Sequence, residues 1–229
     1  MKTILIALLA FAILSAPQLS QAQLRVGPTV GFNLTSFQHS RDFKERLGET
    51  SILPRLRMQI GAIAEYALLD QLYLQSGLIF NGAGVKYQEE GNVRGNTVTV
   101  STKVLINYLD IPLTARYQIA ELDNFSLSAW GGFVMGIAVS GRFKNEQSGN
   151  GESGSNSEPF GIGSGDDAYL KRGDFRLALG MVAESAEYPI QFKVALNQGL
   201  VNTISGPRPG FAQRNFLFSL TASYLFELD

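Results

Sequence analysis

The stretch that decides the fold is LRVGPTVGFNLT, residues 24–35, in which apolar side chains alternate with polar or small ones without a break. A period of two is that of an extended strand, whose successive side chains point to opposite faces, and not the 3.6 of a helix. One face would carry Leu24, Val26, Pro28, Val30, Phe32 and Leu34, and the other Arg25, Gly27, Thr29, Gly31, Asn33 and Thr35. The stretch therefore predicts a strand with one apolar face and one polar face.

The same alternation recurs along the chain. Residues 216–228 repeat it, and only Leu217 and Leu225 interrupt the polar face. Between the two ends, six further segments have a strand-like pattern, at approximately 58–68, 72–84, 104–120, 125–143, 173–185 and 188–201. The predicted strands number eight, and an even number returns both termini to one side of a sheet or barrel.

The predicted connections alternate between short and long. Residues 69–71, 121–124 and 186–187 have the length and composition of antiparallel hairpin turns. Long polar connections separate them, at residues 36–57, 85–103, 144–172 and 202–213. Outer-membrane barrels combine short periplasmic turns with longer external loops. We therefore predict an eight-stranded antiparallel up-and-down transmembrane β-barrel with this arrangement.

The first 22 residues have the organisation of a secretory signal peptide. Lys2 precedes an uncharged apolar run from Ile4 to Leu14, and Ser20 and Ala22 place small residues at a cleavage site. The run is shorter than the roughly 20 residues that a spanning helix needs. We predict a signal peptide at residues 1–22, a barrel domain at 23–229, and export to the outer membrane of a diderm (Gram-negative) bacterium.

The composition excludes several classes of protein. The 229 residues include no Cys, which excludes disulfide scaffolds, zinc ribbons and thiol enzymes. The net charge of −1 lacks the basic excess of a nucleic-acid binder. A mean hydropathy of +0.05 is what an apolar outer surface averaged with a polar interior would give.

Aromatic residues near the predicted strand ends fit the two interfacial girdles of a membrane barrel. These residues are Phe37, Tyr66, Tyr73, Tyr87, Tyr117, Phe125, Phe143, Phe175, Tyr188 and Phe226. A soluble, lipocalin-like barrel is the alternative, because the period of two does not say which face meets lipid.

The segment NYLDIPLTARY, residues 107–117, resembles the Tyr-Leu-Glu-Ile-Pro-Leu-x-x-Lys-Tyr strand of PorT-like outer-membrane β-barrel proteins. Asp110 and Arg116 keep the charges of that pattern. The later segments at 129–133, 174–180 and 197–202 follow in the order found in that family. The resemblance implies an outer-membrane location, and one member of the family takes part in protein secretion.

Charged residues are predicted on the inward face of the barrel. Strand parity places there Arg25, Glu65, Asp110, Arg116, Arg176, Glu184, Lys193 and Glu227, four basic and four acidic residues. The interior of an eight-stranded barrel is just wide enough for side chains to fill it. We predict a plug of paired ions, with a narrow porin-like channel as the alternative, and a β-bulge at Pro112.

Catalytic and metal sites find little support in the sequence. The sole histidine, His39, lies beside Ser40 and near Asp42, Glu45 and Glu49, so a lipid-modifying hydrolase is an alternative, but we predict no enzyme. The acidic pairs at 89–90 and 166–167 lack the spacing of a calcium loop, and we predict no metal and no cofactor.

Two of the predicted external loops have distinct compositions. Residues 148–157 are rich in Gly and Ser and predict a flexible loop, whereas residues 41–57 could form a short amphipathic helix or pack over the barrel mouth. We predict a monomer that contacts outer-membrane lipid and acts as envelope scaffold, surface-binding or secretion-accessory protein. A partner would be an envelope or secretion-system protein, and not a nucleic acid.

Overall fold

The computed structural model describes residues 24–93, 96–149, 152–164, 168–205 and 211–228, and the predicted signal peptide lies outside these ranges. The elements are β1 (Leu24–His39), α2 (Arg41–Leu47), β2 (Ser51–Leu69), β3 (Leu72–Val93), β4 (Asn96–Glu121), β5 (Phe125–Gly149), β6 (Glu152–Pro159), β7 (Gly161–Ile162), β8 (Ala168–Leu170), β9 (Gly173–Ser185), β10 (Ile190–Gly199), β11 (Gln213–Tyr224) and β12 (Phe226–Leu228). Among the described residues, no helix has the length and apolar character needed to cross a bilayer.

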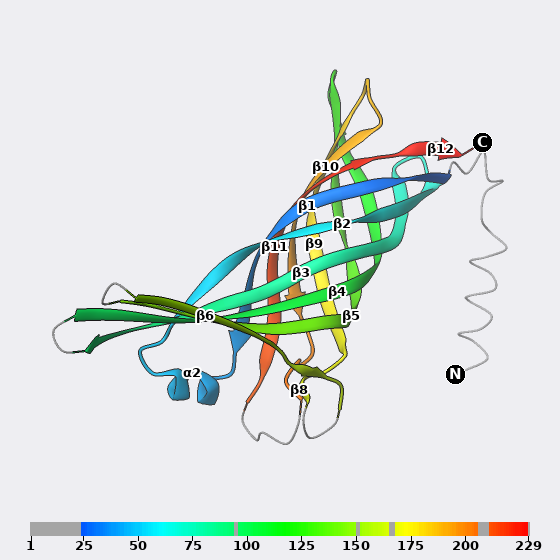
Figure 1. Cartoon of the computed structure of the whole chain (residues 1–229). Coiled ribbons are helices and arrows are strands. Elements are labelled where there is room, and N and C mark those ends of the chain that lie inside the picture. Colours follow the sequence, from blue (N-terminus) through cyan, green and yellow to red (C-terminus); the bar gives the residue numbers. More distant parts are fainter. Residues whose placement is uncertain (1–23, 94–95, 150–151, 165–167, 206–210, 229) are drawn as a thin grey trace, which may run out of the picture.

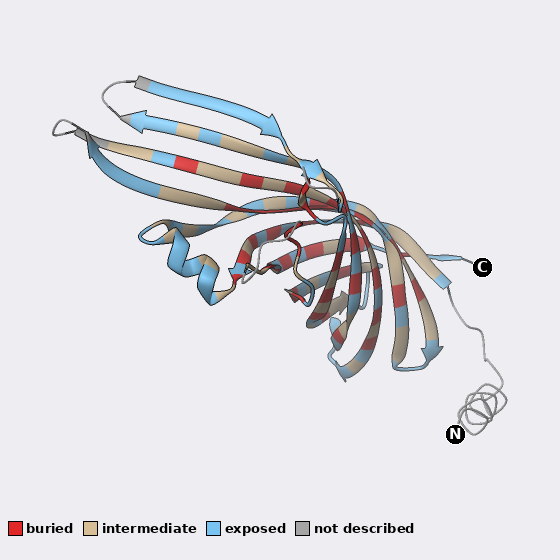
Figure 2. Cartoon of the chain, turned by 90° about the horizontal axis from the view of Figure 1, so that it is seen from below, coloured by how far each residue is buried: buried red, intermediate tan, exposed pale blue. Residues whose placement is uncertain are grey.

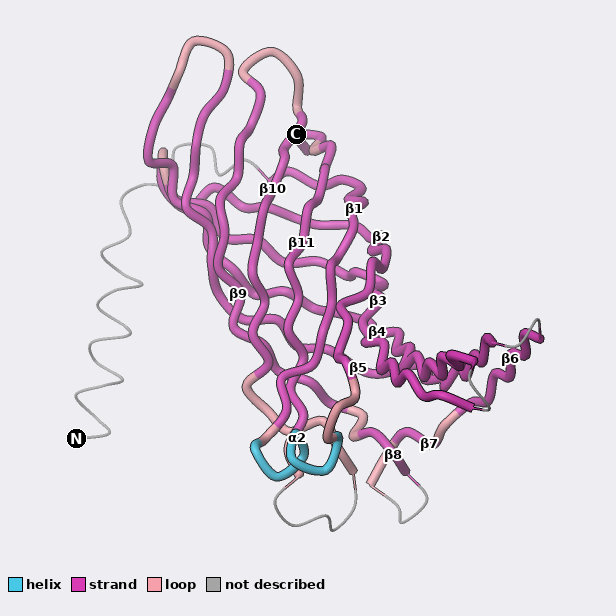
Figure 3. The backbone as a smooth tube through the Cα atoms, turned by 90° about the vertical axis from the view of Figure 1, so that its left-hand side faces the viewer, coloured by secondary structure: helices cyan, strands magenta, loops and turns pink. Residues whose placement is uncertain are grey.

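Eight strands close into a ring. The order is β1–β2–β3–β4–β5–β9–β10–β11, every neighbour is antiparallel, and β11 and β12 pair back to β1 (Figures 1 and 3). The predicted barrel is therefore confirmed. The ladder partners once around the ring run Arg25, Glu65, Gln75, Thr114, Gly132, Ala178, Asn197, Leu217 and Thr35. The path returns to β1 ten residues further along, and such a stagger makes the strands tilt relative to the barrel axis.

Burial shows which face of the strands is inside. In β1, Asn33 is 0% exposed and Thr29 3%, whereas Phe32 is 48% exposed. The same alternation of buried and exposed positions runs around the ring (Figure 2). Most of the polar side chains of the ring therefore point inward, and a belt of large apolar side chains faces outward, which is the arrangement of a membrane barrel and excludes the soluble alternative.

Two of the predicted long loops are mostly strand. β3 and β4 stay paired out to Val93 and Asn96, and β5 and β6 stay paired out to Gly149 and Glu152. These hairpins project beyond the ring, away from the carboxyl terminus (Figure 1). The predicted loops at 85–103 and 144–172 are therefore paired strands at 85–93, 96–103, 144–149 and 152–159, and the flexible loop predicted at 148–157 is strand at its described residues. Residues 88–92 and 144–158 are polar or Gly, so their composition resembled that of loops.

The first external connection is shorter than predicted. β1 continues to His39 and β2 begins at Ser51, with the helix α2 between them. Gly48 ends the helix at a φ of 57°, a left-handed conformation that glycine adopts without strain. The short helix predicted within residues 41–57 is therefore present, and it lies at the end of the barrel opposite the carboxyl terminus (Figure 3).

Pro112 does not create a β-bulge. The β3–β4 ladder has the same register on both sides of it, at Ser76–Leu113 and at Ile79–Asp110, but the pairs between are missing. Proline lacks the N–H that a ladder pair needs, and the sheet opens locally without inserting a residue. The bulge prediction at this position was wrong.

The predicted aromatic girdles are only partly present. Tyr117, Tyr188 and Phe226 are 51%, 56% and 53% exposed on the outer surface. Phe37 is buried in the interior, and the Tyr73 ring lies against the Arg116 guanidinium at 3.9 Å from its centroid. Tyr87 and Phe143 also pack against the interior cluster rather than the outer surface. Parity places Phe37, Tyr73 and Tyr87 on the inward face, and a register shift between Ala138 and Ser140 turns Phe143 inward as well.

Candidate functional site in the barrel lumen

The end of the lumen nearest the termini holds a closed network of two arginines and two glutamates. Arg116 of β4 and Glu65 of β2 are both fully buried and pair through two bonds, Nε–Oε2 at 3.1 Å and Nη2–Oε1 at 2.9 Å. Arg25 of β1 pairs with both Glu65 and Glu184 of β9. Arg116 Nη1 lies 3.0 Å from Glu184 Oε2, which closes the ring of charges. We refer to these four residues as the inner network.

Neighbouring polar groups complete the hydrogen bonding of the inner network. Gln75 Nε2 donates to Glu65 Oε2 at 3.3 Å, and Gln191 Nε2 donates to both Glu65 and Glu184. Arg116 Nη1 donates to Ser128 Oγ at 3.1 Å. Buried ions are tolerated when they are paired and their remaining donors and acceptors are satisfied, as they are here.

A second network lies nearer the external end and consists of Asp110, Asp174 and Arg176. Arg176 Nη2 pairs with Asp110 Oδ1, and its Nε lies 3.0 Å from Asp174 Oδ2. Asn81 Nδ2 donates to Asp110 Oδ2 at 2.6 Å, and Asn215 Nδ2 donates to Asp174 Oδ2 at 2.7 Å. We refer to the three charged residues as the outer network.

Gly136 of β5 makes room for the outer network. A Cβ atom at this position would lie 2.8 Å from Arg176 Nη2 and 2.8 Å from Asp110 Oδ1. Such contacts are too short, so the ion pair can cross the lumen only because this inward position has no side chain.

Lys193 lies between the two networks and has no carboxylate partner there. Its Nζ is 3.5 Å from Gln75 Oε1 and 4.2 Å from the Trp130 ring centroid. A cavity of about 40 Å³ borders Lys193, Asp110 and Trp130, which is room for a few water molecules. The outer network has two acids and one arginine, and the Lys193 ammonium borders the same cavity as Asp110 without forming an ion pair with it.

Seven of the eight charged residues predicted to face inward lie in the lumen, and Glu227 does not. The inner network unites Arg25, Glu65, Arg116 and Glu184, the outer network contains Asp110 and Arg176, and Lys193 lies between them. Glu227 is not part of either network. It is exposed in β12, which among the described strands pairs with β1 alone, beyond the end of β10, so solvent surrounds it.

Asp174 takes the place of Glu227 in the balance of four acids and four bases, and sequence reasoning missed it. A signal for it was present, because Asp174 is two residues from Arg176 in one strand and therefore shares its inward face.

Comparison with known protein families agrees with a membrane barrel that has a polar lumen. A family model described as outer membrane protein beta-barrel domain matches residues 18–205. The chain belongs to this family. It is therefore an outer-membrane β-barrel protein of Gram-negative bacteria, in agreement with its apolar outer surface. None of the curated proteins matches the chain in sequence.

Several solved structures resemble the barrel at low identity. The attachment invasion locus protein Ail of Yersinia pestis is 14% identical, covers 88% of this chain and 98% of its own, and gives a TM-score of 0.32. The outer membrane protease OmpT of Escherichia coli is 10% identical, covers 93% and 99%, and gives a TM-score of 0.44. Neisserial surface protein A is 9% identical, covers 89% and 97%, and gives 0.36.

The external end of this outer-membrane barrel is apolar inside. Val85, Val104, Ile106, Leu170 and Leu217 form a buried cluster there with Phe37, Ala83, Tyr108 and Ala138. Leu170 comes from the short β8, and it is 0% exposed. The predicted polar connection at 144–172 thus supplies a hydrophobic side chain that closes the mouth. Its apolar residues 160, 162, 169 and 170 were the signal in the sequence.

His39 is held in an aromatic environment at the external mouth. Its Nε2 lies 2.8 Å from Tyr87 Oη, and its ring stacks on Phe43 at 4.5 Å. Burial, together with the nearby Lys44 ammonium, lowers the pKa of His39 to about 4. Asp42 and Glu45 are exposed in α2, and Glu49 is exposed just beyond it. His39 therefore has a structural partner in Tyr87. The described residues contain no group of three or more His, Asp or Glu side chains that could hold a metal ion.

Proposed function

We propose that this protein is a closed outer-membrane barrel that acts through its external β-sheet, as an envelope scaffold or surface-binding protein, rather than as a channel or an enzyme. One contrast carries the proposal. The lumen is occupied by two ion networks and an apolar cluster, whereas strands β3 to β6 continue outside the barrel, and the described side chains of β6 are all exposed (Figure 2).

The lumen argues against conduction. An ion entering from the periplasmic side would have to break the two-bond Arg116–Glu65 pair, in which both side chains are 0% exposed. Beyond it lie the 40 Å³ cavity and then the apolar cluster around Leu170. Breaking a buried ion pair costs several kcal/mol, about 3–5 when one partner is removed.

Planar-bilayer recording tests the closed lumen. We expect no steady conductance from the purified protein and no change when Thr114, which is inward and buried, is replaced by Trp. An open-pore conductance that Thr114→Trp abolishes would contradict the proposal and favour the porin-like alternative.

The external sheet supports a binding role. β6 pairs only with β5 among the described strands, so its other edge carries backbone N–H and C=O groups available to an added strand. All side chains described in β6 are exposed. The resemblance of residues 107–117 to PorT-like proteins supports an envelope or secretion-system protein as the partner.

Site-specific photo-crosslinking in whole cells tests this role. A crosslinking residue at Ser155 of β6 should give adducts with an envelope protein, whereas one at the outward-facing Leu113 should give lipid adducts only. Replacing residues 144–158 by a two-residue turn should abolish association with the envelope protein that crosslinks to Ser155. The barrel of this variant should still fold, as shown by a change in its gel mobility on heating. Equal protein crosslinking at both positions, or no protein adduct at Ser155, would contradict the proposal.

A non-catalytic role agrees with the environment of His39. The ring that a hydrolase would need is bonded to Tyr87 and covered by Phe43. We expect His39→Ala to leave the lipid profile of the host unchanged, and a specific loss of one modified lipid species would revive the hydrolase alternative. We also propose that the barrel is a monomer, which light scattering in detergent tests.

A further inference from the structure

The barrel wall has a gap at the external end, between the start of β9 and the segment that follows β10. The last ladder pair of these strands is Arg176–Gly199, and Leu200 N–H then donates to the Phe175 carbonyl at 2.8 Å. The next backbone bond between the two described segments runs from Lys171 N–H to the Thr203 carbonyl at 2.7 Å. Between these bonds the two segments separate, and a pocket forms in the wall.

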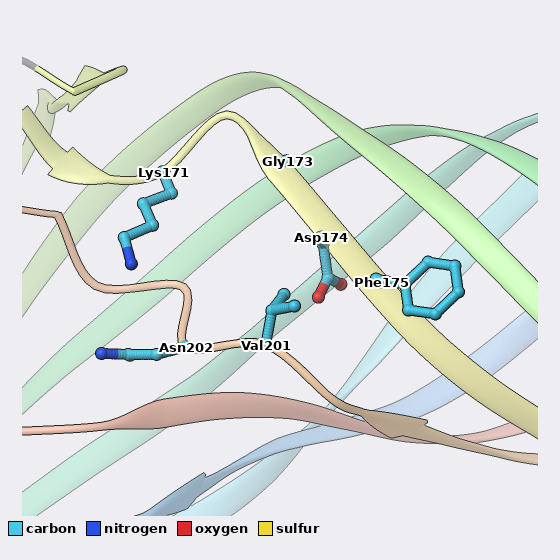
Figure 4. A pocket seen from close by; sticks show the side chains of 6 residues that line it. All are labelled: Lys171, Gly173, Asp174, Phe175, Val201 and Asn202. Atoms are coloured by element: carbon cyan, nitrogen blue, oxygen red, sulfur yellow. The ribbon is translucent and has the colours of Figure 1, made fainter.

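The pocket has a volume of about 600 Å³ and is lined by Lys171, Gly173, Asp174, Phe175, Val201 and Asn202 (Figure 4). β9 has 13 residues, and at about 3.3 Å per residue a tilted strand of this length just crosses the hydrocarbon layer. Its first residues therefore lie at the level of the outer headgroups.

Asp174 supplies an incompletely satisfied carboxylate to the pocket. Its Oδ2 faces Asn215 Nδ2 and Arg176 Nε, but its Oδ1 is buried without a hydrogen-bond partner. The residue is 5% exposed and its side chain 1%, so the carboxylate lies at the inner end of the pocket. A buried acceptor without a donor is costly, and the outer network has two carboxylates for one arginine. A cationic donor in the pocket would correct both deficits after a small rotation about the soft terminal bond of Asp174.

The other walls of the pocket are a cation and an apolar surface. Lys171 is exposed, and its side chain lies on the opposite side of the pocket from Asp174 (Figure 4). Phe175 faces outward and stacks on Phe133 at 5.2 Å, and the neighbouring Leu200 and Val201 are 42% and 37% exposed. The pocket thus combines an acid, a base and a lipid-facing apolar rim.

We propose that this pocket binds the zwitterionic headgroup of a phospholipid that carries a primary ammonium. The ammonium donates to Asp174, the phosphate pairs with Lys171, and the first acyl carbons lie against Phe175 and Val201. An ammonium with N–H donors fits better than a quaternary one, because the free acceptor on Asp174 needs a hydrogen bond and not only a charge.

Native mass spectrometry of the purified full-length barrel tests the site. Nanodiscs would contain phosphatidylethanolamine, phosphatidylcholine or phosphatidylglycerol, and the number of retained lipids is counted for each. We expect phosphatidylethanolamine to be retained about tenfold better than the other two, which is the gain from roughly one charge-assisted hydrogen bond. Equal retention of all three lipids would overturn the proposal.

Variants separate the pocket from the ion network beneath it. Asp174→Asn and Lys171→Gln should each remove the preference, and Lys103→Gln, in the external sheet, should not. Because Asp174→Asn also alters the outer network, Val201→Trp provides a second variant that fills the pocket and leaves every charge in place. Preference that survives in Val201→Trp would overturn the proposal.

Free phosphoethanolamine distinguishes a lipid from a soluble ligand with the same headgroup. If the acyl carbons contribute, the free compound at the concentration of the lipid should not displace it. Full displacement would show that the site takes the soluble headgroup, and the proposed lipid would then be wrong.

Discussion

Strand β4 passes through two environments, and the two parts behave differently. Inside the barrel, Leu113 faces lipid at 52% exposure while Arg116 is 0% exposed in the lumen. In the external part, Lys103 of β4 pairs with Glu146 of β5, which also lies 2.9 Å from Lys144, and these side chains are 18%, 31% and 41% exposed. The same alternation of side chains therefore seals charged groups in the lumen in one part and leaves them partly exposed to water in the other. Removing one partner of an ion pair should therefore cost more in the lumen than in the external sheet, because little water is available in the lumen to solvate the charge that remains.

The largest difference between the two parts should come from removing one carboxylate in each. Glu65→Gln leaves Arg116 and Arg25 without their main partner in the lumen, and we expect it to lower the free energy of unfolding by about 3–5 kcal/mol. Glu146→Gln in the external sheet is the matched control and should leave stability unchanged. Urea unfolding in lipid vesicles, followed by the single Trp130, measures both. An equal loss of unfolding free energy in the two variants would show that ion pairs in the lumen and in the external sheet do not differ in this respect.

A charge on the outer surface should reveal where lipid ends. Leu113 and Val100 both lie on β4 and are 52% and 43% exposed, the first within the barrel and the second beyond it. Leu113→Arg should cost about 2–4 kcal/mol because it places a charge in hydrocarbon, whereas Val100→Arg should cost almost nothing. The same unfolding assay applies, and a tolerated Leu113→Arg would mean that this face does not meet lipid.

Two glycines offer a smaller comparison. Gly136→Ala would press a methyl group against the Arg176–Asp110 pair, and we expect a loss of about 1–3 kcal/mol. Gly91→Ala, in the external part of β3, meets no atom within 4 Å and should be neutral or slightly stabilising. Thermal unfolding in detergent distinguishes them, and a neutral Gly136→Ala would show that the outer network can relax without cost.

The smallest expected effect is local and depends on pH. His39 has a pKa of about 4 in the folded protein, below its ordinary value of 6.5, because burial disfavours its charged form. The unfolded chain therefore binds the proton first, and the stabilisation present above pH 6.5 declines as the pH falls towards 4 and is constant below it. Hydrogen exchange of the α2 amides, relative to the intrinsic exchange rate at each pH, should accelerate over this range in the wild type and not in His39→Asn. Acceleration in both would assign the effect to another group.

Much of the barrel could be predicted because apolar and polar residues alternate along its strands. The period of two located the eight ring strands and, through parity, placed Arg25, Glu65 and Arg116 on one inner face. The external hairpins escaped prediction, since residues 88–92 and 144–158 are polar or Gly and resemble loops in composition, although Val98 and Val100 alternate with threonines as in a strand. Glu227 was misplaced for a related reason. Its parity is inward, but the ring no longer surrounds it at that height.

The sequence by itself determined two faces for each strand, one apolar and one polar, because alternating side chains must point in opposite directions. Only the tertiary structure decided which face was inside and which charges met. Closure of the ring turned the polar face inward, and its stagger of ten residues, from Arg25 to Thr35, set the height of each strand. That stagger brings Glu65 to Arg116, and Asp110 to Arg176, across the lumen. Pairing over such distances depends on every register in the ring at once, and no local pattern in the chain contains it.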